Sequence, residues 1–198
     1  MIKRRIAVYL KNLPGKRIDR KLLMLSVDDY GNVHRASRKA REKLKSQGLS
    51  VDANRFTTYD AFETADDLHA LFDTLRSVKD KEGKPAVFTA FSTCANIHFE
   101  RSISEGTYCY ELLPDTLAQS ESHRDVWQIW QQGSSERLLA PQFHGREHLN
   151  VRLFNTLLEK KHPGLMANLQ QRSYAAIRHD ESRVGYTEAF SYKTKYLI

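Results

Sequence analysis

Two adjacent carboxylates, Asp28 and Asp29, stand where a short apolar run ends, in the stretch MLSVDDYGNVH of residues 24–34. Neighbouring residues of a strand point to opposite faces, and the turn at Gly31 can rotate them further. We therefore expect separate tasks for the two carboxylates, one as a metal ligand and the other as a free base. The alternative is a pair that caps the following helix and stabilises its positive amino end.

A pair of histidines carries the second pattern. His144 and His148 lie four residues apart in PQFHGREHL, residues 141–149, so on a helical turn both imidazoles would face the same way. Two histidines and one aspartate are a common ligand set for a catalytic divalent ion, zinc above all. We expect one of the two aspartates to converge with His144 and His148 on one such ion, with ligand atoms within about 5 Å of each other. Solvated or purely structural histidines are the alternative.

The two motifs resemble those of a known superfamily. SVDDYG followed by HGREH resembles the NodB-type polysaccharide deacetylases, and VDDYG is also similar to the YdjC-like deacetylases. The resemblance spans about residues 20–160. It implies that Asp28 is the general base and that Asp29, His144 and His148 hold the metal. It further implies a parallel (β/α) barrel and the removal of N- or O-acetyl groups from an acetylated carbohydrate.

The chain also departs from that superfamily. The spacing from Asp29 to His144 is longer than is usual in that superfamily. Its later Arg-Pro motif and the later histidine that acts as general acid are not found. Too few strands are predicted to close a barrel, so we expect an incomplete barrel. An incomplete barrel leaves a free strand edge, through which copies of the chain could associate. The competing hypothesis is a remnant or binding domain that has the fold without the chemistry.

Strand and helix patterns alternate along the chain, which predicts one α/β domain over residues 1–198 with a parallel sheet. The predicted strands are residues 22–27, 86–91, 138–143 and 174–177. The predicted helices cover about 34–47, a segment opened by a capping box at Thr64 with an apolar stripe to Val78, a segment near 126–130 followed by Gly133, and one capped by Asn150. At the expected carboxyl ends of these strands, ligands can bind.

Six other residues are weaker candidates for the site. Asn96 follows the second strand and could bind substrate or serve a turn. Arg146 and Glu147 lie inside the histidine motif and could orient its ligands or simply be exposed. His179 is a candidate acid by position alone. Trp127 and Trp130 could stack on sugar rings, but the apolar stripe around Trp130 favours core packing.

Composition sets the limits of these hypotheses. The chain of 198 residues is 40% hydrophobic and 28% charged, as in a globular domain, with a formal net charge of +7. Residues 1–50 carry fourteen Lys or Arg and four Asp or Glu, a net +10. We interpret this basic segment as a solvated face and expect no nucleic-acid partner. A nucleic-acid-binding function would leave the aspartate pair and the histidine pair unexplained. Cys94 and Cys109 suggest free thiols, and without an apolar run of about 20 residues we expect a cytoplasmic protein with no membrane span.

Overall fold

A small parallel sheet organises the protein, whose structure is a computed structural model describing residues 10–11, 19, 21–32, 34–52, 58–181 and 185–188. The sheet has the order β1-β2-β5, from β1 (Leu25–Tyr30), β2 (Phe88–Ser92) and β5 (Leu139–Phe143). A second sheet pairs β3 (Ala95–Ile97) with β4 (Tyr110–Leu112) in antiparallel orientation. The fold is therefore mixed α/β with a parallel core, as predicted.

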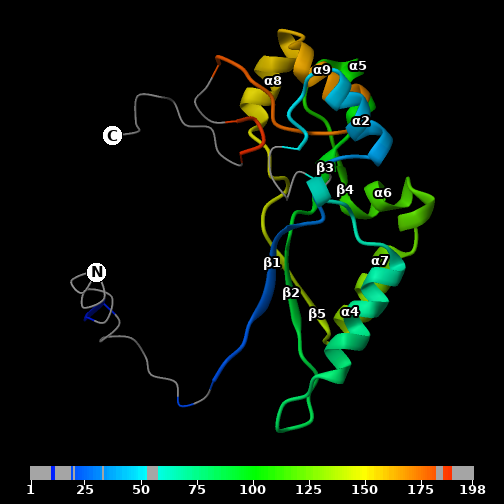
Figure 1. Ribbon diagram of the computed structural model, residues 1–198, viewed down its shortest axis with the longest axis vertical. Helices are drawn as coiled ribbons and strands as arrows, with labels where there is room; N and C mark the ends of the chain where they lie inside the picture. Colours follow the sequence, from blue (N-terminus) through cyan, green and yellow to red (C-terminus); the bar gives the residue numbers. More distant parts are fainter. Residues whose placement is uncertain are drawn as a thin grey trace.

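The helices form two groups (Figure 1). Helices α4 (Ala65–Ser77) and α7 (Val126–Ser135) lie beside the parallel sheet. Four helices gather beyond the carboxyl ends of the strands: α2 (Arg38–Ser46), α5 (Phe99–Glu105), α8 (Val151–Glu159) and α9 (Pro163–Gln170). Between the groups run α6 (Leu113–Ala118) and the short 3-10 helix η1 (Glu121–His123).

Each group has its own apolar core. The core at the sheet combines side chains of α4 and α7 with strand residues: Leu68, Phe72, Leu75, Ala90, Val126, Ile129, Trp130 and Leu139. The second core joins α5, α8 and α9 through Phe99, Leu153, Phe154, Leu157, Leu165 and Leu169, with Tyr174 and Tyr186. Burial of each such side chain contributes roughly 1.5–3 kcal/mol. The carboxyl ends of the strands therefore lie at the junction of two separately packed cores.

The two faces of the parallel sheet differ in chemistry. Residues in register share a face in a parallel pair, so Leu25, Phe88 and Leu139 lie on the face that the helices cover. The next register row, Ser26, Thr89 and Ala140, lies on the opposite face. This second face continues with Phe91 and Gln142 in its following row and leads to Asp28 at the end of β1.

The closed barrel is not confirmed, and the predicted fourth strand is wrong. Within the described residues the parallel sheet has three strands, and 173–179 have no regular secondary structure. The backbone of this apolar segment pairs elsewhere: the Tyr174 amide donates to the His34 carbonyl, and the Ala175 amide donates to Asn168 Oδ1. Side chains and loops thus satisfy the groups that a strand ladder would have used.

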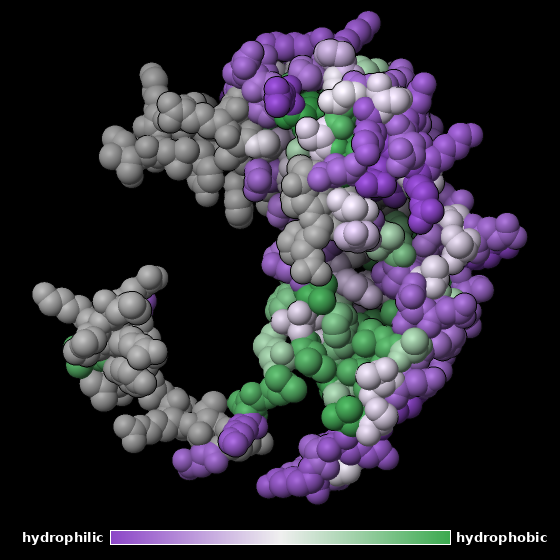
Figure 2. All heavy atoms as spheres, in the orientation of Figure 1, coloured by the Kyte–Doolittle hydropathy of each residue, from purple (hydrophilic) through white to green (hydrophobic). Residues whose placement is uncertain are grey.

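The free edges of the sheet stay exposed. Leu25 and Val27 of β1 are 38% and 41% exposed, and Phe143 of β5 is 78% exposed. Figure 2 shows hydrophobic side chains gathered over this part of the molecule, whereas hydrophilic side chains cover the region of α2. Association of copies through such an edge stays a prediction. No described helix combines the length and the apolar character needed to cross a bilayer.

Two predicted helix caps are confirmed, whereas other helix bounds differ from the prediction. Thr64 and Asp67 form the predicted capping box of α4, and Asn150 caps α8 through the Leu153 amide. The helix predicted from residue 34 begins only at Arg38, where Ser37 accepts from the Ala40 amide, and Val33 lies outside the described residues. Val78 lies beyond the end of α4 and is exposed.

Gly133 lies inside α7 and does not end the helix. The absence of a side chain at this position lets α7 pack closely against Phe72 of α4. A Cβ atom at this position would overlap the ring of Phe72 on α4. Alanine in a free helix would stabilise it by about 0.5–1 kcal/mol relative to glycine. We expect Gly133→Ala instead to destabilise the protein by about 1–3 kcal/mol, since Phe72 must shift. Denaturant unfolding measures this, with Ser134→Ala, an exposed position of the same helix, as the control. A Gly133→Ala protein as stable as the control would disprove the close α4–α7 contact.

Candidate metal centre

A β-bulge at the end of β1 brings both aspartates to one side. Val27 pairs with Ala90 and Tyr30 with Ser92, so two residues of β1 stand opposite the single residue Phe91 of β2. Asp29 has a left-handed backbone with φ of 54°, which a simple strand would not allow. Strand alternation alone would separate the two carboxylates, and the bulge removes that separation.

Both carboxylates reach the same imidazole. His144 Nε2 lies 2.9 Å from Asp28 Oδ1 and 3.3 Å from Asp29 Oδ1. His144 follows β5 directly, and its amide donates to the Ser92 carbonyl, which continues the pairing with β2. Its ring also meets the edge of Phe91, with centroids 6.2 Å apart. The end of the parallel sheet thus fixes three of the four predicted residues.

The second histidine reaches the site by a different route from the one predicted. Residues 144–150 are irregular, so the helical turn expected between His144 and His148 is wrong. Gly145, with φ of 114°, turns the chain, and the amides of Cys94 and Ala95 donate to the carbonyls of Gly145 and Arg146. His148 Nε2 nevertheless lies 3.8 Å from Asp29 Oδ1. The structure brings Asp28, Asp29 and His144 together, whereas His148 approaches this group only through Asp29, which lies between the two imidazoles.

The spacing of the ligand atoms suits a shared cation. Asp28, Asp29 and His144 offer ligand atoms that all lie within 4.8 Å of one another. Two ligands bound to one tetrahedral zinc at about 2.0–2.2 Å stand roughly 3.3 Å apart. Asp29 Oδ1 is buried and accepts no hydrogen bond from the part of the chain that the structure describes, and the two imidazole nitrogens are its polar neighbours. A buried carboxylate oxygen without a hydrogen bond is costly. A divalent ion with nitrogen and oxygen ligands would satisfy this oxygen, so the residues fit such an ion.

His148 is held in the tautomer that a metal ligand needs. Its Nδ1 lies 2.8 Å from the Thr187 carbonyl oxygen, which can only accept, so Nδ1 carries the proton. Nε2 therefore keeps its lone pair on the side of Asp29. A backbone carbonyl that fixes the distal nitrogen in this way is the usual support of a metal-bound histidine.

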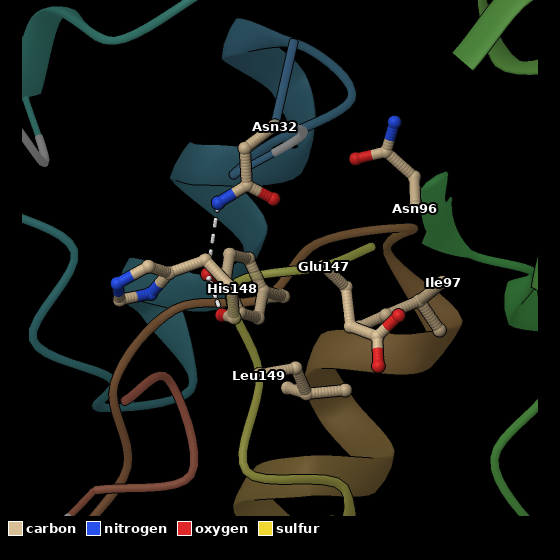
Figure 3. A pocket seen from close by; sticks show the side chains of 7 residues that line it. Asn32, Asn96, Ile97, Glu147, His148 and Leu149 are labelled. Carbon is tan, nitrogen blue, oxygen red and sulfur yellow. Dashed lines mark hydrogen bonds between the residues drawn. The ribbon is translucent and has the colours of Figure 1, made fainter. Parts of the chain in front are cut away.

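A buried tyrosine fixes the main chain of the same residue. The Tyr174 hydroxyl donates to the His148 carbonyl at 2.8 Å, and Asn32 Nδ2 donates to that hydroxyl at 3.0 Å (Figure 3). These residues line a small cavity with Glu147 and Leu149. Burial raises the pKa of Tyr174, and the negative charge of Asp29 adds to the effect. The hydroxyl therefore stays protonated and remains a donor.

A histidine–aspartate pair extends this network. His34 Nδ1 contacts Asp60, its Nε2 lies 3.4 Å from Asn32 Nδ2, and its ring stacks on Tyr174 at 5.0 Å. No motif in the sequence predicts a role at the site for His34, Asp60 or Tyr174. Asn32 and His34 follow the aspartates closely, and that proximity was a usable signal. Asp60 and Tyr174 come from distant segments, and no pattern in the sequence connects them to the site.

The weaker candidates lie around the site in supporting positions. Asn96 is buried and donates to the Gly31 carbonyl at 3.0 Å, which holds the turn after the aspartates. Arg146 pairs with Glu147, and its guanidinium lies 4.7 Å from the ring centroid of Tyr110 on β4. These contacts anchor the histidine loop to the β3–β4 hairpin. The hydrogen bond from Arg146 to Glu147 raises the pKa of the guanidinium further.

The remaining candidates lie apart from the four residues. Trp130 is buried, stacks on Tyr30 at 5.1 Å and donates to Glu63, as expected of a core residue. Trp127 lines an apolar groove of about 330 Å³ with Phe143. His179 is half-buried, and no contact within the described residues connects it to the aspartates.

Comparison of the chain with models of known protein families, with curated proteins and with solved structures found no match. The geometry of the site and the two motifs are therefore the basis for a function.

The tyrosine network makes a prediction about metal affinity. Tyr174→Phe removes the donor to the His148 carbonyl, so His148 is held less firmly and zinc affinity should fall about 10- to 100-fold. A competition titration with a chelator measures the affinity. Tyr186→Phe is the matched control, because its hydroxyl is also buried and donates to a main-chain carbonyl, that of Ala175, away from His148. Equal losses in the two variants would mean general loosening and contradict the positioning of His148 by Tyr174.

Proposed function

We propose that the protein is a metal-dependent hydrolase that removes N- or O-acetyl groups from carbohydrates, with zinc as the metal. The observation that carries the proposal is the convergence of Asp28, Asp29 and His144 within 4.8 Å, at the carboxyl ends of parallel strands. The resemblance of SVDDYG and HGREH to the deacetylase motifs supports it, because each motif contributes residues to this one site.

The two aspartates differ in a way that suits two roles. The Asp29 side chain is 39% exposed and lies near both imidazoles, whereas Asp28 is 70% exposed and approaches His144. We assign Asp29, His144 and His148 to the metal. Asp28 faces solvent, where it can accept a proton from a water molecule that attacks an acetyl carbon.

The overall reaction is simple hydrolysis. Water adds to the acyl carbon, the bond to the sugar nitrogen or oxygen breaks, that atom takes up a proton, and acetate leaves. A bound divalent ion supplies polarisation of the acyl carbonyl and acidifies a water molecule. The chain's own contributions are the base at Asp28 and a fixed set of ligands, with His148 held by Thr187 and Tyr174.

The two roles predict different effects for two conservative changes. Asp29→Asn removes a charged ligand, so both zinc affinity and activity should collapse. Asp28→Asn leaves the ligands in place and removes the base, so zinc should stay bound while the rate falls roughly 10² to 10⁴-fold. The measurements are a zinc titration and acetate release from an N-acetylated amino-sugar oligomer and its O-acetylated counterpart.

Asp115→Asn, a change of an exposed aspartate in α6, is the control and should alter neither quantity. Equal loss of zinc in Asp28→Asn and Asp29→Asn would show that the carboxylates bind the ion jointly. Full activity in Asp28→Asn would remove it from the mechanism. Wild-type protein that binds zinc and releases no acetate from either substrate would contradict the proposed activity and favour a binding domain.

A further inference from the structure

A second, larger cavity lies beside the candidate metal centre and is lined with arginines. This arginine groove, of about 910 Å³, lies between the start of α2, residues 58–62, and the α6–η1 segment. Four guanidinium groups line it: Arg35, Arg38, Arg41 and Arg172. Among the described lining residues, Asp60 is the sole carboxylate, and it already pairs with His34. Arg41 and Arg172 are ion-paired with carboxylates outside the lining, so the surplus of positive charge in the cavity comes from Arg35 and Arg38.

Three of these arginines are held in place by other segments of the chain. Arg35 Nη1 donates to the Val51 carbonyl at 2.9 Å. Arg41 binds Asp52, and Arg172 binds Glu100 and Gln119. Fixed guanidinium groups lose less conformational entropy on binding an anion than mobile ones do. The groove is thus partly preorganised for a ligand.

The fourth arginine is left without such a partner, in an electrostatically unfavourable place. Arg38 opens α2, is exposed, and forms no ion pair with a described residue. The first turn of α2 has no acidic residue, and Lys39 adds a second cation there. Cations at the positive end of a helix dipole are unfavourable, whereas an anion is stabilised. A bound anion would offset this local cost.

The groove is connected to the metal centre. Asp60 of the groove wall contacts His34, whose ring stacks on the Tyr174 that holds His148. On the other wall, Thr116 Oγ1 lies 3.4 Å from Asn96 Nδ2, and Asn96 holds the Gly31 turn after the aspartates. A ligand in the groove would therefore lie against the residues that surround the proposed reaction site.

We propose that the arginine groove binds an acidic saccharide, one that bears carboxylate or phosphate groups, and so sets the substrate class of the site. This rests on the proposed function for the saccharide part. Uncharged lining groups such as Ser120 and the 81% exposed Tyr59 suit sugar hydroxyls and ring faces. A volume of about 910 Å³ is in the range of small-ligand pockets, which favours a short saccharide over a nucleic-acid duplex.

Direct binding tests the proposal without any need for catalysis. The probes are a uronic acid trimer, a phosphorylated hexosamine, a neutral N-acetylated trimer of matched length, inorganic phosphate and a 20-bp DNA duplex, each titrated calorimetrically against the full chain. We expect binding of the uronate or the phosphorylated sugar at least about tenfold tighter than that of the neutral trimer, with the affinity falling as salt is raised. The two acidic sugars distinguish carboxylate from phosphate recognition.

Arg38→Gln should weaken the acidic sugar about tenfold and leave the neutral trimer unchanged. Arg152→Gln is the matched control, since this exposed arginine stands in the first turn of α8, outside the groove. Equal effects of both changes, equal affinity for acidic and neutral trimers, or preference for phosphate alone or for the duplex would overturn the proposal. Binding of the acidic sugar without release of acetate from acetylated forms would instead contradict the proposed hydrolysis and leave the groove assignment standing.

Discussion

The bulge at Asp28 and Asp29 is the constraint on which the site depends. It needs a left-handed residue in mid-strand, which costs free energy that the surroundings must supply. The following turn has a positive φ at Gly31, where a Cβ would lie 2.8 Å from Leu113 Cδ2. Asn96 holds the carbonyl of that glycine, and the Thr93 amide donates to the Tyr30 carbonyl. The β3–β4 hairpin and α6 thus hold the two carboxylates in place.

The candidate metal centre lies at the junction of two cores, and each positions part of it. The parallel sheet supplies Asp28, Asp29 and His144 through strand ends, so its helices α4 and α7 fix their spacing. The second core supplies the support of His148, through Tyr174 and the Thr187 carbonyl. Because both cores must form before the ligands meet, metal binding should be coupled to the folding of the whole described chain.

Local signals explain what could be predicted from the sequence. The three parallel strands were found within a few residues, because each is a short apolar run with an abrupt polar end. The capping box at Thr64 and the cap at Asn150 were found because capping needs particular side chains at fixed spacing. The proximity of the two motifs followed from the rule that parallel strands meet at one edge.

What could not be predicted depends on contacts between distant segments. The bulge is a difference in register between β1 and β2, which neither strand shows alone. The hairpin β3–β4 has strands of three residues, too short for a periodic pattern. Tyr174 lies in an apolar run that resembles a strand, and only its long-range bonds to His34 and His148 show its actual place. Arg172 joins the groove through Glu100 and Gln119 in the same way.

The most direct measurement is the crystal structure of the zinc-loaded protein with anomalous scattering at the zinc edge. Our account predicts one strong anomalous peak about 2.0–2.2 Å from Asp29 Oδ1 and from the Nε2 atoms of His144 and His148. Asp28 should then face the open side of the ion. A peak located elsewhere would contradict the central claim that the bulge builds a metal centre. The same holds if no peak appears at a stoichiometric zinc concentration while Asp29, His144 and His148 keep the positions described above.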